Sequence, residues 1–143
     1  MSDPGVMRVQ EAKIERELAC LKVLIEDFRA ANEALPLALQ LARLVGTWRR
    51  VLVARERLVY APRMAAPDGG DALMAATCRE QMRAVADRVE YHAQRWSSSA
   101  VIATDFARFR HQSMALIAAI ETHFDCDRSL LGSGIADRQR MAA

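Results

Sequence analysis

Apolar side chains recur every three or four residues along a first segment, about residues 9–31. The recurring positions are Ile14, Leu18, Leu21, Ile25 and Phe28. This spacing places one apolar stripe along a helix and is typical of a helix that packs against a core. A second segment, about residues 37–59, repeats the pattern after Pro36, a residue that favours the first turn of a helix. Its candidate core positions are Leu41, Leu44, Trp48, Val51, Leu52 and Leu58.

Two further segments have the same periodicity. The third, about residues 71–96, has an inward face formed by Leu73, Met74, Met82, Val85, Val89, His92 and Trp96. The fourth, about residues 105–131, has a stripe formed by Phe106, Phe109, Leu116, Ile117, Ile120, Phe124 and Leu131. We expect Asp71 and Thr104 to cap these two helices, because a side-chain oxygen before a helix can accept a hydrogen bond from a free amide of its first turn.

Glycine, proline and serine separate the four segments. The stretch "APRMAAPDGG" follows the second, "SSSAVIAT" follows the third, and "GSG" at residues 132–134 ends the fourth. Long helices joined by short links predict an all-α fold, a four-helix up-down-up-down bundle. Residues 1–143 should form a single domain with its core at about 9–132 and a flexible tail at 133–143. In such a bundle Trp48, Trp96, Phe109 and Ile120 should be at least half buried.

Composition and charge narrow the class of protein. The chain of 143 residues is 52% hydrophobic and 27% charged, which is typical of a globular domain. A net charge of +2 gives no reason to expect nucleic-acid binding. No apolar run approaches the length of a membrane-spanning helix, and the first residues contain no secretory signal. Three cysteines without a C-x-x-C pair are typical of a reduced compartment, so we expect a cytoplasmic protein.

The stretch "VLVARERLVYAPRM" in the second segment resembles a phrase of bacterial hemerythrin-like (HHE cation-binding) domains, "HLxxEDxxLYPxL". It keeps Leu52, Leu58, Tyr60 and Pro62, with Ala61 as an inserted residue. The third segment resembles a subgroup of that family through Glu80, Met82, Val85, Val89, His92 and Trp96. The fourth does so through "TDFARF" and "THFDCDRSLL". The resemblance covers about residues 9–132 and implies the hemerythrin-like bundle.

The resemblance also implies a di-iron centre, which needs about five histidines and two bridging carboxylates on inward helix faces. This chain has three histidines, His92, His111 and His123. Val51 stands where a histidine ligand is expected, and Arg55 stands where a bridging carboxylate is expected. The first helix offers Glu17 or Leu18 at the ligand position, and the third offers Met82. Only His123 and Asp127 keep the spacing of a ligand pair.

Two interpretations of His123 and Asp127 remain open. They form either a hydrogen-bonded pair one helical turn apart, or a residual half-site for a single metal completed by Glu17 or Glu56. The space that the metal would fill predicts a relic pocket lined by Glu17, Val51, Arg55, Met82, His123 and Asp127. Of the other histidines, His92 should pack as an aromatic residue and His111 should be exposed to solvent.

Arg55 raises a question of charge, because an unpaired guanidinium inside an apolar bundle would cost several kcal/mol. It must either extend to the end of the bundle or pair with an acid. We predict that Arg55 reaches Asp127 or Glu17, and that this ion pair takes the place of the metal as a link between helices.

These patterns favour a hemerythrin-like bundle that has lost its di-iron site, holds no cofactor, is not an enzyme, and acts as a metal-independent binding or regulatory module. One alternative is a metal-binding relative that handles iron, oxygen or nitric oxide; another is an apolar-ligand pocket lined by Val51, Met82 and His123. The cationic face with Arg49, Arg50 and Arg57 suggests an acidic protein partner. Trp96 and exposed methionines would permit a homodimer.

Overall fold

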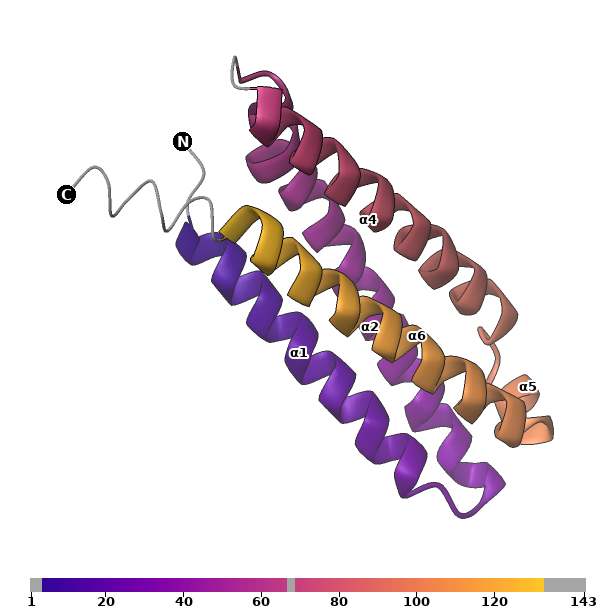
Figure 1. Ribbon diagram of the computed structural model, residues 1–143. Helices are drawn as coiled ribbons and strands as arrows, with labels where there is room; N and C mark the ends of the chain where they lie inside the picture. Colours follow the sequence, from indigo (N-terminus) through magenta and orange to yellow (C-terminus); the bar gives the residue numbers. More distant parts are fainter. Residues whose placement is uncertain (1–3, 67–68, 133–143) are drawn as a thin grey trace.

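A computed structural model describes residues 4–66 and 69–132, and every element in these two ranges is helical (Figure 1). The long helices are α1 (Pro4–Glu26), α2 (Ala34–Arg55), α4 (Gly69–Arg95) and α6 (Phe106–Asp127). The predicted all-α class is therefore confirmed, with no strand in the described ranges. None of the helices described is long and apolar enough to cross a membrane.

Short elements join or extend the long helices. A 3-10 turn, η1 (Ala31–Glu33), connects α1 to α2, and α5 (Ser99–Thr104) lies between α4 and α6. Each of α2 and α6 continues into a π-helical turn, η2 (Glu56–Tyr60) and η3 (Arg128–Gly132). After η2 the chain continues as α3 (Ala61–Met64), with Pro62 in its first turn.

The four long helices lie side by side (Figure 1). Helix α1 contacts α2 and α6, and α4 contacts α2 and α6. The beginning of α1 and the end of α6 lie at the same end of the molecule (Figure 1). Side chains from these two ends can therefore meet those at the end of α2.

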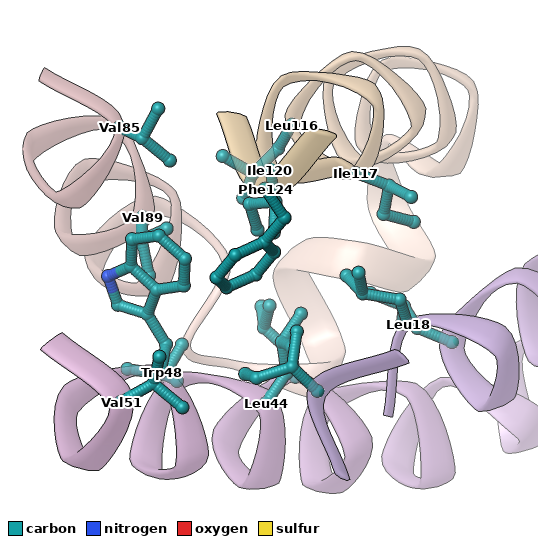
Figure 2. Packing of buried hydrophobic residues seen from close by; sticks show 14 of the residues in the cluster. Leu18, Leu44, Trp48, Val51, Val85, Val89, Leu116, Ile117, Ile120 and Phe124 are labelled. Atoms are coloured by element: carbon teal, nitrogen blue, oxygen red, sulfur yellow. The ribbon is translucent and has the colours of Figure 1, made fainter. Parts of the chain in front are cut away.

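Apolar side chains from all four long helices fill the space between them. Trp48, Trp96, Phe109 and Ile120 are at most 1% exposed, so their predicted burial is confirmed. Figure 2 shows the Trp48 indole of α2 facing the Phe124 ring of α6, with their centroids 5.9 Å apart and an angle of 63° between their planes. Edge-to-face pairs of this kind add to the stabilisation from buried area and fix the two helices in register.

Both predicted helix caps are wrong. Asp71 lies within the first turn of α4, which begins at Gly69. Thr104 ends α5, and its hydroxyl donates to the Ala100 carbonyl at 2.8 Å. The linker between α4 and α6 forms a helix because the Ser98 hydroxyl accepts from the Ala100 amide at 3.2 Å. The predicted flexible tail 133–143, which includes Gly134, lies outside the described residues.

Candidate functional site

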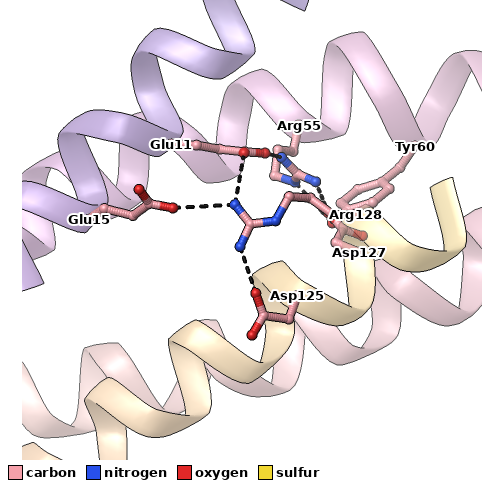
Figure 3. A network of polar contacts seen from close by, with 7 residues as sticks. All are labelled: Glu11, Glu15, Arg55, Tyr60, Asp125, Asp127 and Arg128. Atoms are coloured by element: carbon pink, nitrogen blue, oxygen red, sulfur yellow. Dashed lines mark hydrogen bonds and ion pairs between the residues drawn. The ribbon is translucent and has the colours of Figure 1, made fainter. Parts of the chain in front are cut away.

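Arg55, the last residue of α2, is buried at the centre of a polar network (Figure 3). Its guanidinium forms an ion pair with the Asp127 carboxylate of α6 and donates from Nη1 to Glu11 Oε1 of α1 at 2.7 Å. Its Nε donates to the Tyr60 hydroxyl at 3.4 Å. The prediction that Arg55 reaches Asp127 is therefore confirmed. The alternative acid, Glu17, instead accepts from Gln40 Nε2 at 2.6 Å.

The π-helical turn η2 explains why Tyr60 joins this network. Tyr60 follows Arg55 by five residues, which is the hydrogen-bonding interval of a π-helix, so the two side chains lie on one face. The Tyr60 hydroxyl donates to Asp127 Oδ2 at 3.0 Å. Burial raises the pKa of Tyr60 despite the opposing charge of Arg55, so the hydroxyl keeps its proton and remains a donor at neutral pH.

The network continues from the core to solvent through Arg128 of η3 (Figure 3). Arg128 Nη1 lies 3.6 Å from Glu11 Oε2 and 3.3 Å from Glu15 Oε1, and its Nη2 lies 2.6 Å from Asp125 Oδ1. The Arg128 side chain is 47% exposed, whereas those of Arg55 and Asp127 are 5% and 0% exposed. Exposed pairs contribute little to stability, so the buried pair is the part whose disruption should matter most.

His123 precedes Asp127 by one turn of α6 but does not bond to it. Both ring nitrogens of His123, and Asp127 Oδ1, are buried without a hydrogen-bond partner in the described part of the chain. The predicted His123–Asp127 hydrogen bond is therefore wrong, because the carboxylate turns toward Arg55 and Tyr60. Burial and the nearby charge of Arg55 lower the pKa of His123 to about 4, so its ring is neutral at pH 7.

The residues predicted to line a relic pocket do not act as one set. Arg55 and Asp127 come together, and Val51 and Met82 are fully buried in the apolar core. Glu17 does not join them, since its carboxylate contacts Gln40. Within residues 4–66 and 69–132, no group of three or more His, Cys, Asp or Glu side chains is arranged to hold a metal ion.

The other two histidines lie as predicted. His92 is buried, stacks against Phe109 with centroids 5.9 Å apart, and shares a hydrogen bond of 2.9 Å with the Ser113 hydroxyl. Burial, with a smaller effect from the charge of Arg88, lowers the pKa of His92 to about 4. His111 is exposed. The histidine–serine contact was not predicted, because the helical stripe does not show which polar residue of α6 faces His92.

The predicted cationic face is exposed, but its arginines differ in pairing. Arg49 donates to both carboxylate oxygens of Glu90 at 2.7 Å, and Arg50 donates to the Thr47 hydroxyl at 3.3 Å. Arg57 is exposed and has no ion-pair partner in the ranges that the structure describes. Arg49 is thus partly neutralised, whereas Arg50 and Arg57 keep their charges available.

The predicted exposure of Trp96, one basis for a homodimer, is wrong. Trp96 is 1% exposed, and its indole donates to Gln112 Oε1 at 3.0 Å. The methionine side chains described, at positions 7, 64, 74, 82 and 114, are all buried or partly buried. Trp96 therefore offers no exposed apolar contact, Met1 and Met141 lie outside the described residues, and the homodimer stays a prediction.

Sequence reasoning missed Glu11, Tyr60 and Arg128 as members of the network. For Glu11 a signal exists, because it lies in the apolar stripe of α1 between Met7 and Ile14, at helical spacing from both. A charged residue in such a stripe must find a buried partner. Arg55 continues the stripe of α2 in the same way after Trp48 and Val51.

Comparison of the chain with models of protein families, with curated proteins and with solved structures finds no match.

Proposed function

We propose that this chain is a hemerythrin-like, four-helix up-down-up-down bundle in which an arginine-centred ion-pair network occupies the place of a di-iron site. It acts as a metal-independent binding or regulatory module in the bacterial cytoplasm and catalyses no reaction. The observation that carries this proposal is the buried Arg55–Asp127 ion pair. Its basis in sequence is the resemblance of the second and fourth segments to the family's metal-binding helices.

The position of Arg55 works against a metal in two ways. Its guanidinium forms ion pairs with Asp127, one of the two residues of the residual half-site, and with Glu11. It would also repel a metal ion placed beside it. At a separation of about 4 Å and an effective dielectric constant of about 20, repulsion between a dication and a guanidinium is about 8 kcal/mol. A metal would need to displace this cation before it could bind.

Elemental analysis tests the proposal directly. Protein expressed in iron-supplemented medium and purified without chelator should contain far less than one equivalent of iron per chain. About two irons per chain, with absorbance bands of an oxo-bridged iron pair, would contradict the proposal. An Arg55→Met variant analysed in parallel tests whether the cation itself excludes the metal, since methionine removes the charge and roughly keeps the volume.

A second candidate is a metal-binding protein of the same family that handles iron, oxygen or nitric oxide. The observation that favours it is the set of buried, unpartnered atoms on α6, both ring nitrogens of His123 and Asp127 Oδ1. These atoms are potential metal ligands. The same elemental analysis on a His123→Ala variant separates the candidates. A metal that is present in the unaltered protein and lost in the variant would favour this second function.

A further inference from the structure

A surface groove lies between the first half of α1 and the outer face of α2. It has a volume of about 640 Å³ and is lined by Gln10 of α1 and by residues of α2 and η2. The latter are Arg49, Arg50, Val53, Ala54, Arg57 and Leu58. Its lining contains apolar and cationic side chains and, within the part of the chain described, no acidic one. Three other grooves in the described part of the chain each have at least one acidic side chain in their lining.

The lining residues form two parallel rows on the helix. Arg49, Val53 and Arg57 are spaced by four residues, as are Arg50, Ala54 and Leu58. Residues four apart lie on one helix face, so each row places an apolar side chain close to an arginine. From Arg49 to Leu58 the rise is about 14 Å at 1.5 Å per residue, which matches between two and three turns of a second helix.

Two arginines of this groove, Arg50 and Arg57, form no ion pair in the described part of the chain. A neighbouring groove of about 330 Å³ on the α4 side shares Val53 and Arg57 with this one, and its two other arginines are paired with acids. There Arg79 contacts Glu56 at 2.6 Å, and Arg83 contacts Glu80 at 3.1 Å. In the groove beside α1, Arg50 has a hydroxyl as its hydrogen-bond acceptor, and Arg57 forms no ion pair in the described ranges, because the adjacent Glu56 pairs with Arg79. An acidic ligand would therefore gain most at Arg50 and Arg57.

We infer that this groove docks an amphipathic, acidic helix of a partner protein. Val53, which is 57% exposed, with Ala54 and Leu58 would receive the apolar residues of that helix. Arg50 and Arg57 would pair with aspartates or glutamates at its flanks, which is the helix-in-groove mode of recognition. The inference rests on the proposed role as a binding module. A footprint of two to three turns is small, so the complex is transient and sensitive to salt.

The test uses a displayed library of 16-residue helix-forming peptides, selected on the immobilised full-length protein. The enriched sequences should carry apolar residues three and four apart, flanked by Asp or Glu. A synthetic peptide from the enriched set is then measured by fluorescence anisotropy. Charge reversal of one arginine that contacts the peptide should weaken binding by about tenfold or more, so Arg57→Glu and Arg50→Glu should both do so. Raising sodium chloride from 50 to 300 mM should weaken binding further.

Matched controls separate the groove from charge and folding in general. Arg110 is exposed on α6, outside the groove, and Arg110→Glu should change affinity by less than about twofold. Val53→Ser should weaken binding, whereas Leu73→Ser, at a residue 70% exposed on α4, should not. Circular dichroism of every variant should match the unaltered protein, because the substituted side chains are exposed.

Three results would overturn the inference. The first is a library that yields no acidic amphipathic sequences. The second is a 15-nucleotide single strand that binds the protein as tightly as the peptide does and binds the Val53→Ser variant with the same affinity. The surface would then be a general polyanion site. The third is concentration-dependent dimerisation in sedimentation equilibrium that Val53→Ser abolishes, because a second copy would then be the occupant. Metal content is measured separately, so two irons per chain would refute the proposed function whatever the peptide result.

Discussion

At the scale of single residues, Arg55 is the buried cation around which the polar network forms. Arg55 is 4% exposed and has two carboxylates and a hydroxyl as partners. A buried ion pair adds little compared with a well-packed apolar pair, but removal of one member leaves a charge in the core without compensation. The two members of the pair should therefore respond differently to substitution.

Asp127→Ala should lower the free energy of unfolding by about 2 to 4 kcal/mol, because Arg55 would lose its most deeply buried acceptor. Arg55→Met should cost less, since methionine fills the space without a charge and leaves Asp127 the Tyr60 hydroxyl. Urea denaturation of both variants measures the difference. An Asp127→Ala protein as stable as the unaltered one would show that the pair does not link the helices.

The two buried histidines should make stability depend on pH. The folded-state pKa of His92 and that of His123 are each about 4, below the ordinary value of 6.5. The unfolded chain therefore takes up protons first as the pH falls. The contribution of the two neutral histidines to the free energy of unfolding is present above about pH 6.5 and is lost progressively between pH 6.5 and pH 4. Each histidine should contribute a loss of about 2 kcal/mol between pH 7 and pH 5.

Urea denaturation at pH 7 and pH 5 checks this dependence. His123→Leu should reduce the loss of stability between the two pH values by about half, because one of the two titrating groups is removed. Leu73→Ser is the control, since Leu73 is exposed and carries no group that titrates. An unchanged dependence in His123→Leu would contradict protonation of this ring as a cause.

At the scale of the elements, the two π-helical turns lie where the network is built. Turn η2 brings Tyr60 onto the same face as Arg55, and η3 begins with Arg128. A π turn widens the helix locally and is frequently found at functional sites. Ala61 follows the widened turn η2 directly and begins α3.

Tyr60→Phe should lower the free energy of unfolding by about 1 to 2 kcal/mol, because the buried Asp127 carboxylate would lose one hydrogen bond and Arg55 another. Thermal unfolding followed by circular dichroism measures the effect. Tyr91→Phe is the matched control, since Tyr91 is 66% exposed and should leave the unfolding midpoint unchanged. Equal midpoints for both variants would mean that the Tyr60 hydroxyl does not support the network.

At the scale of the whole molecule, the network joins α1, α2 and α6 at one end, and apolar packing joins all four long helices along their length. A protein that binds a ligand only in its folded state is stabilised in proportion to the logarithm of ligand concentration. The proposed function therefore predicts that metals do not change the stability of the whole molecule.

The thermal unfolding midpoint should shift by less than about 1 °C on addition of chelator or of excess ferrous iron, because no metal would be coupled to folding. Differential scanning fluorimetry under reducing, anaerobic conditions checks this expectation. Arg55→Met provides the comparison, as removal of the cation would reveal whether His123 and Asp127 retain any affinity for metal. A clear rise with iron in the unaltered protein would favour the metal-binding alternative.

The sequence by itself determined the helical class, most of the core and the position of the main breaks. Periodicity is a local property, so Trp48, Phe109 and Ile120 could be placed in the core without knowledge of their neighbours. It also determined that Arg55 needs an acid, because burial of an unpaired charge is unfavourable wherever the chain folds.

Only the tertiary structure decided which partners the buried polar groups find. Glu11, Tyr60 and Asp127 are 44, 5 and 72 residues from Arg55. The sequence left Asp127 and Glu17 as alternatives and did not bring Glu11 or Tyr60 to the same guanidinium. Whether Glu11 or Glu17 pairs with Arg55 depends on the axial position of α1 relative to α2. Whether Asp127 pairs with Arg55 or with His123 depends on the direction in which its carboxylate points. The helix caps failed for a related reason, since competing backbone acceptors decide whether Thr104 caps the next helix or bonds back within its own.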